Sequence, residues 1–141
     1  MEDREYELEL FKAMAWERDA LHRLYYPFWI LFMAGFVLSL RVPFHWCICL
    51  NSVLLVVFRF LAVLGTGLNF MSQHTDLTGI SCYRWAYVYK TTGKPDEAKK
   101  QYEASQALAG TSVKLNNWLL GVTITFLATA LVGSFLMHVI Q

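Results

Sequence analysis

The chain has 141 residues, of which 56% are hydrophobic and 16% are charged. Soluble domains carry about 45–50% apolar and about 25% charged residues, so this composition argues against an ordinary soluble domain. The formal net charge of +1 argues against nucleic-acid binding driven by bulk charge, and no nucleic-acid recognition motif accompanies it.

Residues 1–24 are predicted to form a charged, amphipathic helix on the cytosolic side. Acidic residues gather at its beginning, where they suit the positive end of the helix dipole. Met14, Leu21 and Leu24 share one face. No helix-breaking residue precedes Pro27, so this helix is predicted to continue into the first membrane span.

Three hydrophobic segments are predicted to cross the membrane, at residues 25–41, 46–71 and 116–140. The last two reach the roughly 20 residues that a helix needs to cross a bilayer, and the first does so once its aromatic shoulder is counted. A buried or re-entrant segment is the alternative for the first. Pro43 lies in the short connection 42–45 and predicts a tight hairpin, so the first two spans should be antiparallel neighbours. The predicted fold class is therefore all-α, an integral membrane protein with three transmembrane helices in a single domain.

The polar stretch before the third span contains a second helix start. Pro95 suits the first helical position, and Asp96 and Glu97 suit the first turn. This helix is predicted to run through Gly110 into the third span as one long helix, although continuity cannot be read from the pattern. The aromatic-rich stretch 76–90 is predicted to be an interfacial helix or hook, with ordinary packing against the two helices as the alternative.

Basic residues predict the orientation. Ten Lys and Arg residues lie before the first span or within residues 72–115, whereas Arg41 stands alone at the start of the hairpin. The positive-inside rule then places the N-terminus and the 72–115 segment in the cytosol and the C-terminus outside. The layout of a charged N-terminal helix, a tight hairpin and a further long helix resembles small bacterial membrane modules attached to defence systems. That resemblance implies the bacterial inner membrane.

Arg59 lies near the middle of the second predicted span, where an unpaired charge costs about 2.5–3.5 kcal/mol on insertion scales. No Asp or Glu occurs between Asp19 and Asp76 or after Glu103, so the spans offer it no acidic partner. A polar stripe shares one side of this helix: Asn51, Arg59, Ala62, Thr66 and Asn69. The stripe is predicted to face a hydrated lumen or a partner's carboxylate. The alternative is a bundle-interior face satisfied by helix contacts.

A row of small residues marks the third span, where Gly121, Thr125, Thr129 and Gly133 recur at four-residue spacing. Small residues in one row let membrane helices approach closely, so the row is predicted to be a helix-packing surface. Whether it packs within one monomer or between protomers stays open at this level.

No residue pattern predicts catalysis, a cofactor or a metal site. The three cysteines, at 47, 49 and 82, are interpreted as membrane-packing residues. The chain is therefore predicted to be a small, non-enzymatic membrane protein that acts as a homo-oligomer in the lipid bilayer. One form of this prediction is a pore that the stripe lines. The alternative is an immunity, exclusion or accessory protein that docks onto a different membrane protein.

Overall fold

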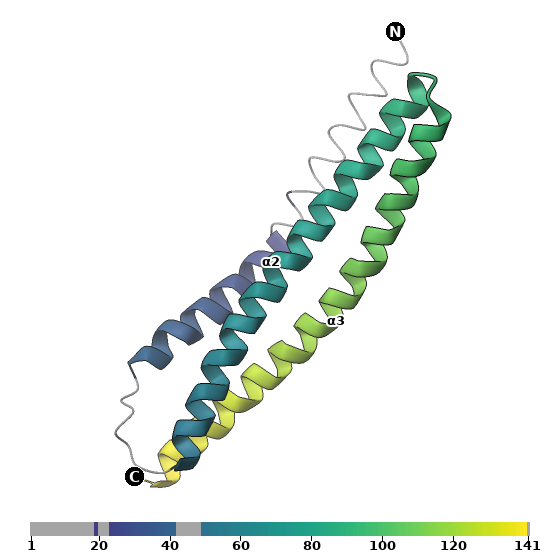
Figure 1. Cartoon of the computed structure of the whole chain (residues 1–141). Coiled ribbons are helices and arrows are strands. Elements are labelled where there is room, and N and C mark those ends of the chain that lie inside the picture. Colours follow the sequence, from purple (N-terminus) through teal and green to yellow (C-terminus); the bar gives the residue numbers. More distant parts are fainter. Residues whose placement is uncertain (1–18, 20–22, 42–48, 141) are drawn as a thin grey trace. The chain divides into compact units, whose positions relative to one another are not determined.

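The computed structural model describes residues 19, 23–41 and 49–140, and these form helices and turns without a strand. The first helix spans Arg23–Leu40, α2 spans Cys49–Thr91 and α3 spans Pro95–Ile140 (Figure 1). Each of the three is long and apolar enough to cross a membrane. This confirms the predicted all-α class and agrees with a three-span membrane protein. The predicted helix before residue 23 and the predicted loop 42–45 lie outside the described residues, apart from Asp19, which is helical.

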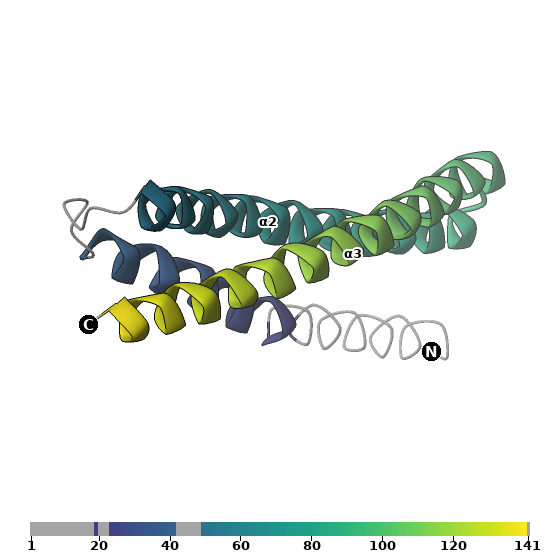
Figure 2. The same cartoon turned by 90° about the horizontal axis from the view of Figure 1, so that it is seen from below.

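Helix α2 has 43 residues and contains both the second apolar segment and the aromatic stretch that follows it. The hydroxyls of Thr75 and Thr78 each donate to the carbonyl oxygen four residues earlier, of Met71 and His74, at 2.8 Å. Such bonds let threonine occupy a helix interior with its hydroxyl satisfied. Residues 76–90 belong to this same helix and form no separate hook. The helix is uninterrupted in both views (Figures 1 and 2).

The turn between α2 and α3 explains why α2 ends at Thr91 and α3 begins at Pro95. Gly93 has a φ of +76°, a left-handed conformation that glycine adopts without steric cost. Its N–H donates to the carbonyl oxygen of Lys90 at 3.4 Å, and the N–H of Lys94 donates to that of Tyr89 at 2.9 Å. This pair of bonds is a Schellman motif, which satisfies the last carbonyls of a helix. Helix α3 then begins at Pro95 as predicted, and it runs through to Ile140 without a break.

The chain divides into two compact units, and the division follows the charge. The charged unit comprises residues 1–26 and 71–114, and the apolar unit comprises residues 27–70 and 115–141. The charged unit holds all 11 acidic residues and ten of the 12 basic residues, which leaves Arg41 and Arg59 in the apolar unit. A segment that lies in hydrocarbon must be nearly free of charge, so the apolar unit is the part suited to the bilayer.

Aromatic rings fill the centre of the apolar unit. Phe126 of α3 stacks on Phe58 of α2 with 4.4 Å between ring centroids, and it meets Phe32 of the first helix edge to face at 5.2 Å. Glycines make room for these rings: a Cβ at Gly35 would overlap Phe126, and one at Gly65 would overlap Phe32. Phe32 and Phe126 are buried as a result. Rings of the three apolar helices thus interlock, and two of the helices provide glycine notches for them.

Small polar residues line the interior of the charged unit. Ser72, Ser105 and Ser112 are buried there, and the Ser105 hydroxyl donates to the carbonyl oxygen of Tyr102 at 2.7 Å. A Cβ added at Gly79 of α2 would lie 3.6 Å from the Cβ of Leu108 on α3, an ordinary van der Waals contact. Small side chains therefore let α2 and α3 approach closely within the charged unit.

Candidate functional site

Arg59 of α2 binds the end of the first helix. Its Nη2 donates to the carbonyl oxygen of Ser39 at 2.7 Å, and its Nε donates to the Ser39 hydroxyl at 3.2 Å. The Ser39 hydroxyl in turn donates to the carbonyl oxygen of Phe36 at 2.6 Å. The guanidinium, the hydroxyl and two backbone carbonyls thus form one connected polar network within the apolar unit.

The acceptor that Arg59 reaches is one that the helix itself cannot satisfy. Ser39 lies in the last turn of the first helix, and the last four carbonyls of any helix lack intrahelical donors. That end of a helix also carries partial negative charge, which favours a cation beside it. A basic side chain within an apolar segment is usually paired with a carboxylate, whereas the described acceptors of Arg59 are one backbone oxygen and one hydroxyl. The described hydrogen bonds of Arg59 are made to a neighbouring helix, which is the arrangement given above as the alternative to a lumen or a partner's carboxylate.

The other described residues of the stripe also face the interior of the apolar unit. Ala62 and Asn69 are buried, and Asn69 has no exposed surface. Thr66 is half-buried, and its hydroxyl donates to the carbonyl oxygen of Ala62 at 2.8 Å. The side chain of Asn51 lies outside what the structure describes. The described members of the stripe therefore lie along one face of α2, but they do not gather into a polar cluster around Arg59.

The row on α3 begins on the outer surface of the apolar unit. Gly121 and Thr125 are exposed, and Thr129 and Gly133 are half-exposed. A Cβ added at either glycine would meet no described atom within 4 Å. The two threonine hydroxyls donate to carbonyl oxygens of α3 itself, Thr125 to Gly121 at 2.9 Å and Thr129 to Thr125 at 2.8 Å. Neither glycine of the row is therefore a close contact point within the described part of the chain.

The inward face of α3 is a different set of residues. Leu119, Val122, Thr123 and Phe126 are buried, and the Thr123 hydroxyl donates to the carbonyl oxygen of Leu119 at 2.7 Å. The glycines used inside the apolar unit are Gly35 and Gly65, on the other two helices. Helix α3 thus supplies a ring to the interior and turns its own glycines away from it.

Several residues that organise these contacts carry no clear signal in the sequence. Ser39 is one serine among many, and Gly35 and Gly65 fall outside any regular row. Asp76, bonded to Tyr25 in the charged unit, does stand out, because it is the one carboxylate between Asp19 and Asp96. A search for isolated acids beside an apolar segment would have found it.

Within the described ranges, no three His, Cys, Asp or Glu side chains lie together in a way that could hold a metal ion. The contacts described above bring together helix ends, aromatic rings and small residues. No protein-family model, curated protein or solved structure matches this chain.

Proposed function

We propose that this chain is a non-enzymatic integral membrane protein that works by assembling with copies of itself in the bilayer through the row Gly121, Thr125, Thr129 and Gly133 of α3. The observation that carries the proposal is the open space beside both glycines, where an added Cβ would meet no described atom within 4 Å. A four-residue spacing of small side chains suits close helix contact, and the described part of the chain supplies no such contact at either glycine.

The chemistry of the row favours van der Waals packing over hydrogen bonding between subunits. The Thr125 and Thr129 hydroxyl protons are already given to carbonyl oxygens of α3. Hydrogen bonds between membrane helices average only about 0.6 kcal/mol in measured cases, so little is lost by using the hydroxyls internally. A second helix can then approach the α3 backbone at the two glycines, which offer it no side-chain bulk.

The contacts of α2 give less support to a pore lined by the polar stripe. Arg59 is bonded to Ser39 of the first helix, and Ala62 and Asn69 are buried inside the apolar unit. A lumen would need these groups to face water in the assembly. The proposal therefore assigns the subunit contact to α3 and gives Arg59 the task of satisfying the first helix.

The charged unit is proposed to lie in the cytosol and the C-terminus outside, in the bacterial inner membrane. Its support is the distribution of basic residues, ten of which belong to the charged unit. Helices α2 and α3 each contribute about 20 residues to this unit, which at about 1.5 Å per residue makes a helical hairpin about 30 Å long.

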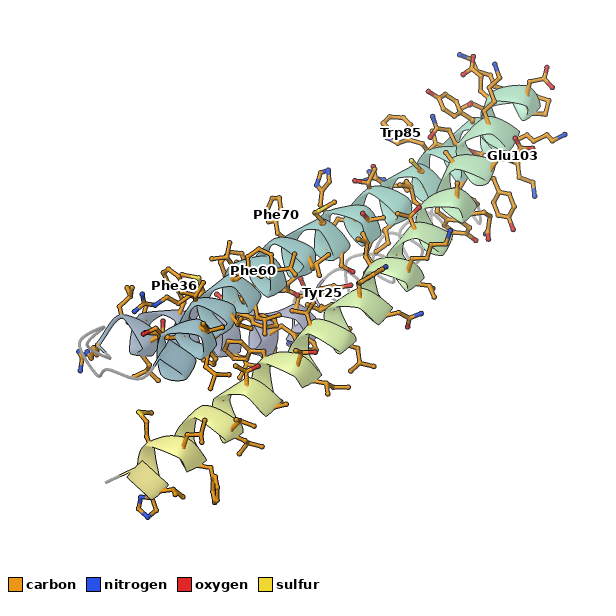
Figure 3. All side chains as sticks on the ribbon, turned by 60° about the horizontal axis from the view of Figure 1, so that its bottom comes forward. Tyr25, Phe36, Phe60, Phe70, Trp85 and Glu103 are labelled. Atoms are coloured by element: carbon orange, nitrogen blue, oxygen red, sulfur yellow. The ribbon has the colours of Figure 1, made fainter. Side chains whose placement is uncertain are left out.

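Docking onto a different protein is the second candidate, and exposed aromatics of the charged unit favour it. The exposed fractions of Tyr83, Trp85 and Tyr102 are about one half. Trp85 projects outward from α2 in Figure 3. Large aromatic side chains are enriched at protein interfaces, where they bury much surface at low entropic cost.

The mass of the full chain in nanodiscs tests the first candidate. We expect an oligomer for the wild type and a monomer for Gly133→Leu and Gly121→Leu, because the leucine would occupy the space of the neighbouring helix. Ser134→Leu is the matched control, since Ser134 is also small and exposed but lies on a different side of α3. An unchanged mass in all three variants would show that the row faces lipid. A wild-type monomer that binds a second protein would favour the docking candidate.

A further inference from the structure

A buried hydrogen-bonded cluster joins the first helix to α2 inside the charged unit. The Tyr25 hydroxyl lies 2.9 Å from the Ser72 hydroxyl and donates to Oδ2 of Asp76. The side chain of Tyr25 is 2% exposed and that of Ser72 is 0% exposed, while Asp76 is half-buried. Figure 3 labels Tyr25, whose ring lies among the helices rather than on the surface.

The donors and acceptors in this cluster have one consistent order. A phenol has a single proton, and Tyr25 gives it to the Asp76 carboxylate. The Ser72 hydroxyl must therefore be the donor in its contact with Tyr25. Ser72 and Asp76 are four residues apart on α2, so they lie on one face of the helix and hold the phenol between them. The phenol is thus fixed by a hydroxyl on one side and a charged oxygen on the other.

The cluster lies where both helices pass from the charged unit into the apolar unit. Tyr25 is two residues before Pro27, where the chain passes into the apolar unit, and Ser72 is two residues after Phe70, where α2 leaves it. A hydrogen bond to an ionised carboxylate is among the stronger ones in proteins. Because Asp76 is half-buried, water can replace the phenol at its carboxylate when the bond opens, so the carboxylate is not left without a hydrogen-bond donor.

We infer that Tyr25, Ser72 and Asp76 form a latch, a reversible contact that holds the beginning of the first helix on α2 at the edge of the charged unit. In the closed state the phenol is bonded to Ser72 and Asp76. In the open state the carboxylate is hydrated and the first turns of the first helix leave α2. Helices α2 and α3 also approach each other at Gly79 and Leu108, a contact that involves no member of the latch, so the rest of the charged unit is expected to stay packed when the latch opens.

Amide hydrogen exchange of the full chain in nanodiscs tests this inference. Tyr25→Phe keeps the ring and removes the hydroxyl, so amides at 23–27 and 70–78 should exchange faster, by on the order of tenfold. Amides of α3 at 98–112 should be unchanged. Tyr26→Phe is the matched control, because Tyr26 is the next residue and is 66% exposed, and it should behave as the wild type.

Two further variants keep the test decisive. Ser72→Ala removes the weaker donor and should speed the same amides by a smaller factor, and Asp76→Asn should have an effect between those of Ser72→Ala and Tyr25→Phe. Faster exchange across all helices in Tyr25→Phe would overturn the latch and make the cluster a part of the global fold. Wild-type exchange at 70–78 in both Tyr25→Phe and Ser72→Ala would overturn it as well.

Discussion

The guanidinium of Arg59 is bonded to the backbone carbonyl of Ser39, at 2.7 Å, in the last turn of a different helix. The one basic residue within the second apolar segment therefore serves as a cap for the first helix. The partial negative charge of a helix end and a serine hydroxyl both lie against its charge. This arrangement makes the shape of the guanidinium as relevant as its charge.

Substitutions of Arg59 should separate those two properties. Arg59→Leu leaves a carbonyl without its donor, which costs about 1–3 kcal/mol, but it also removes an insertion cost of about 2.5–3.5 kcal/mol. We expect these to offset each other, so that the thermal midpoint in detergent stays near that of the wild type.

Arg59→Lys keeps the charge but loses the planar fork that reaches two acceptors at once. We expect it to lower the thermal midpoint more than Arg59→Leu does. Equal stability of the lysine variant and the wild type would show that charge alone accounts for the contact.

Alanine at the two sets of glycines should have effects of opposite sign. A Cβ at Gly35 or Gly65 would overlap a buried phenylalanine ring, so Gly35→Ala and Gly65→Ala should each destabilise the fold by about 1–3 kcal/mol. Gly121→Ala meets open space in the described chain and should stabilise the monomer by about 0.5–1 kcal/mol through its better helix propensity. Thermal unfolding at a detergent concentration that keeps the chain monomeric checks both signs. Destabilisation by Gly121→Ala under those conditions would contradict the outward placement of the row.

The turn at Gly93 should be sensitive to any side chain. Because its φ is +76°, Gly93→Ala should destabilise the hairpin by about 1–2 kcal/mol. Gly93→Asn should cost less, since asparagine tolerates the left-handed region better. Gly110→Ala is the control, because Gly110 lies inside α3 with open space around it, and it should stabilise slightly. Urea unfolding of the charged-unit helices, followed by circular dichroism in nanodiscs, measures the differences, and equal midpoints for the Gly93 and Gly110 alanine variants would refute the role given to the turn.

Topology can be tested by labelling single cysteines in intact cells, in a chain whose three native cysteines are replaced by alanine. Lys94→Cys lies in the turn between α2 and α3 and should stay unlabelled by a membrane-impermeant maleimide until the cells are opened. A cysteine added after Gln141 should be labelled from outside. Labelling of Lys94→Cys in intact cells would reverse the orientation inferred from the basic residues.

The sequence was informative where one physical effect dominates. Apolar runs without charge predicted the three spanning segments, and Pro95 with Asp96 and Glu97 predicted the start of α3. The partner of Arg59 could not be predicted, because a backbone carbonyl occurs at every residue and becomes an acceptor only where a helix ends. The outward placement of the α3 row depended on which ring faced inward, and Phe126 is one of ten phenylalanines in the chain.

The continuity of α2 through its aromatic stretch was missed for a related reason. Residues 76–90 combine aromatic, polar and basic side chains, a mixture that suits a membrane surface as well as a helix outside it. Only the contacts with α3, such as Tyr83 with Tyr102 at 6.4 Å between ring centroids, distinguish the two. Those contacts join positions far apart in the sequence, which local patterns do not record.

The threonines of the membrane segments change what a lipid chain would encounter. Thr125 and Thr129 each direct the hydroxyl proton to a carbonyl of α3 itself, so neither hydroxyl needs an acceptor outside the helix. The part of α3 in the apolar unit is therefore less polar toward its surroundings than its threonines suggest. A scale that assigns each threonine a fixed polarity would underestimate how well this part of the helix suits hydrocarbon.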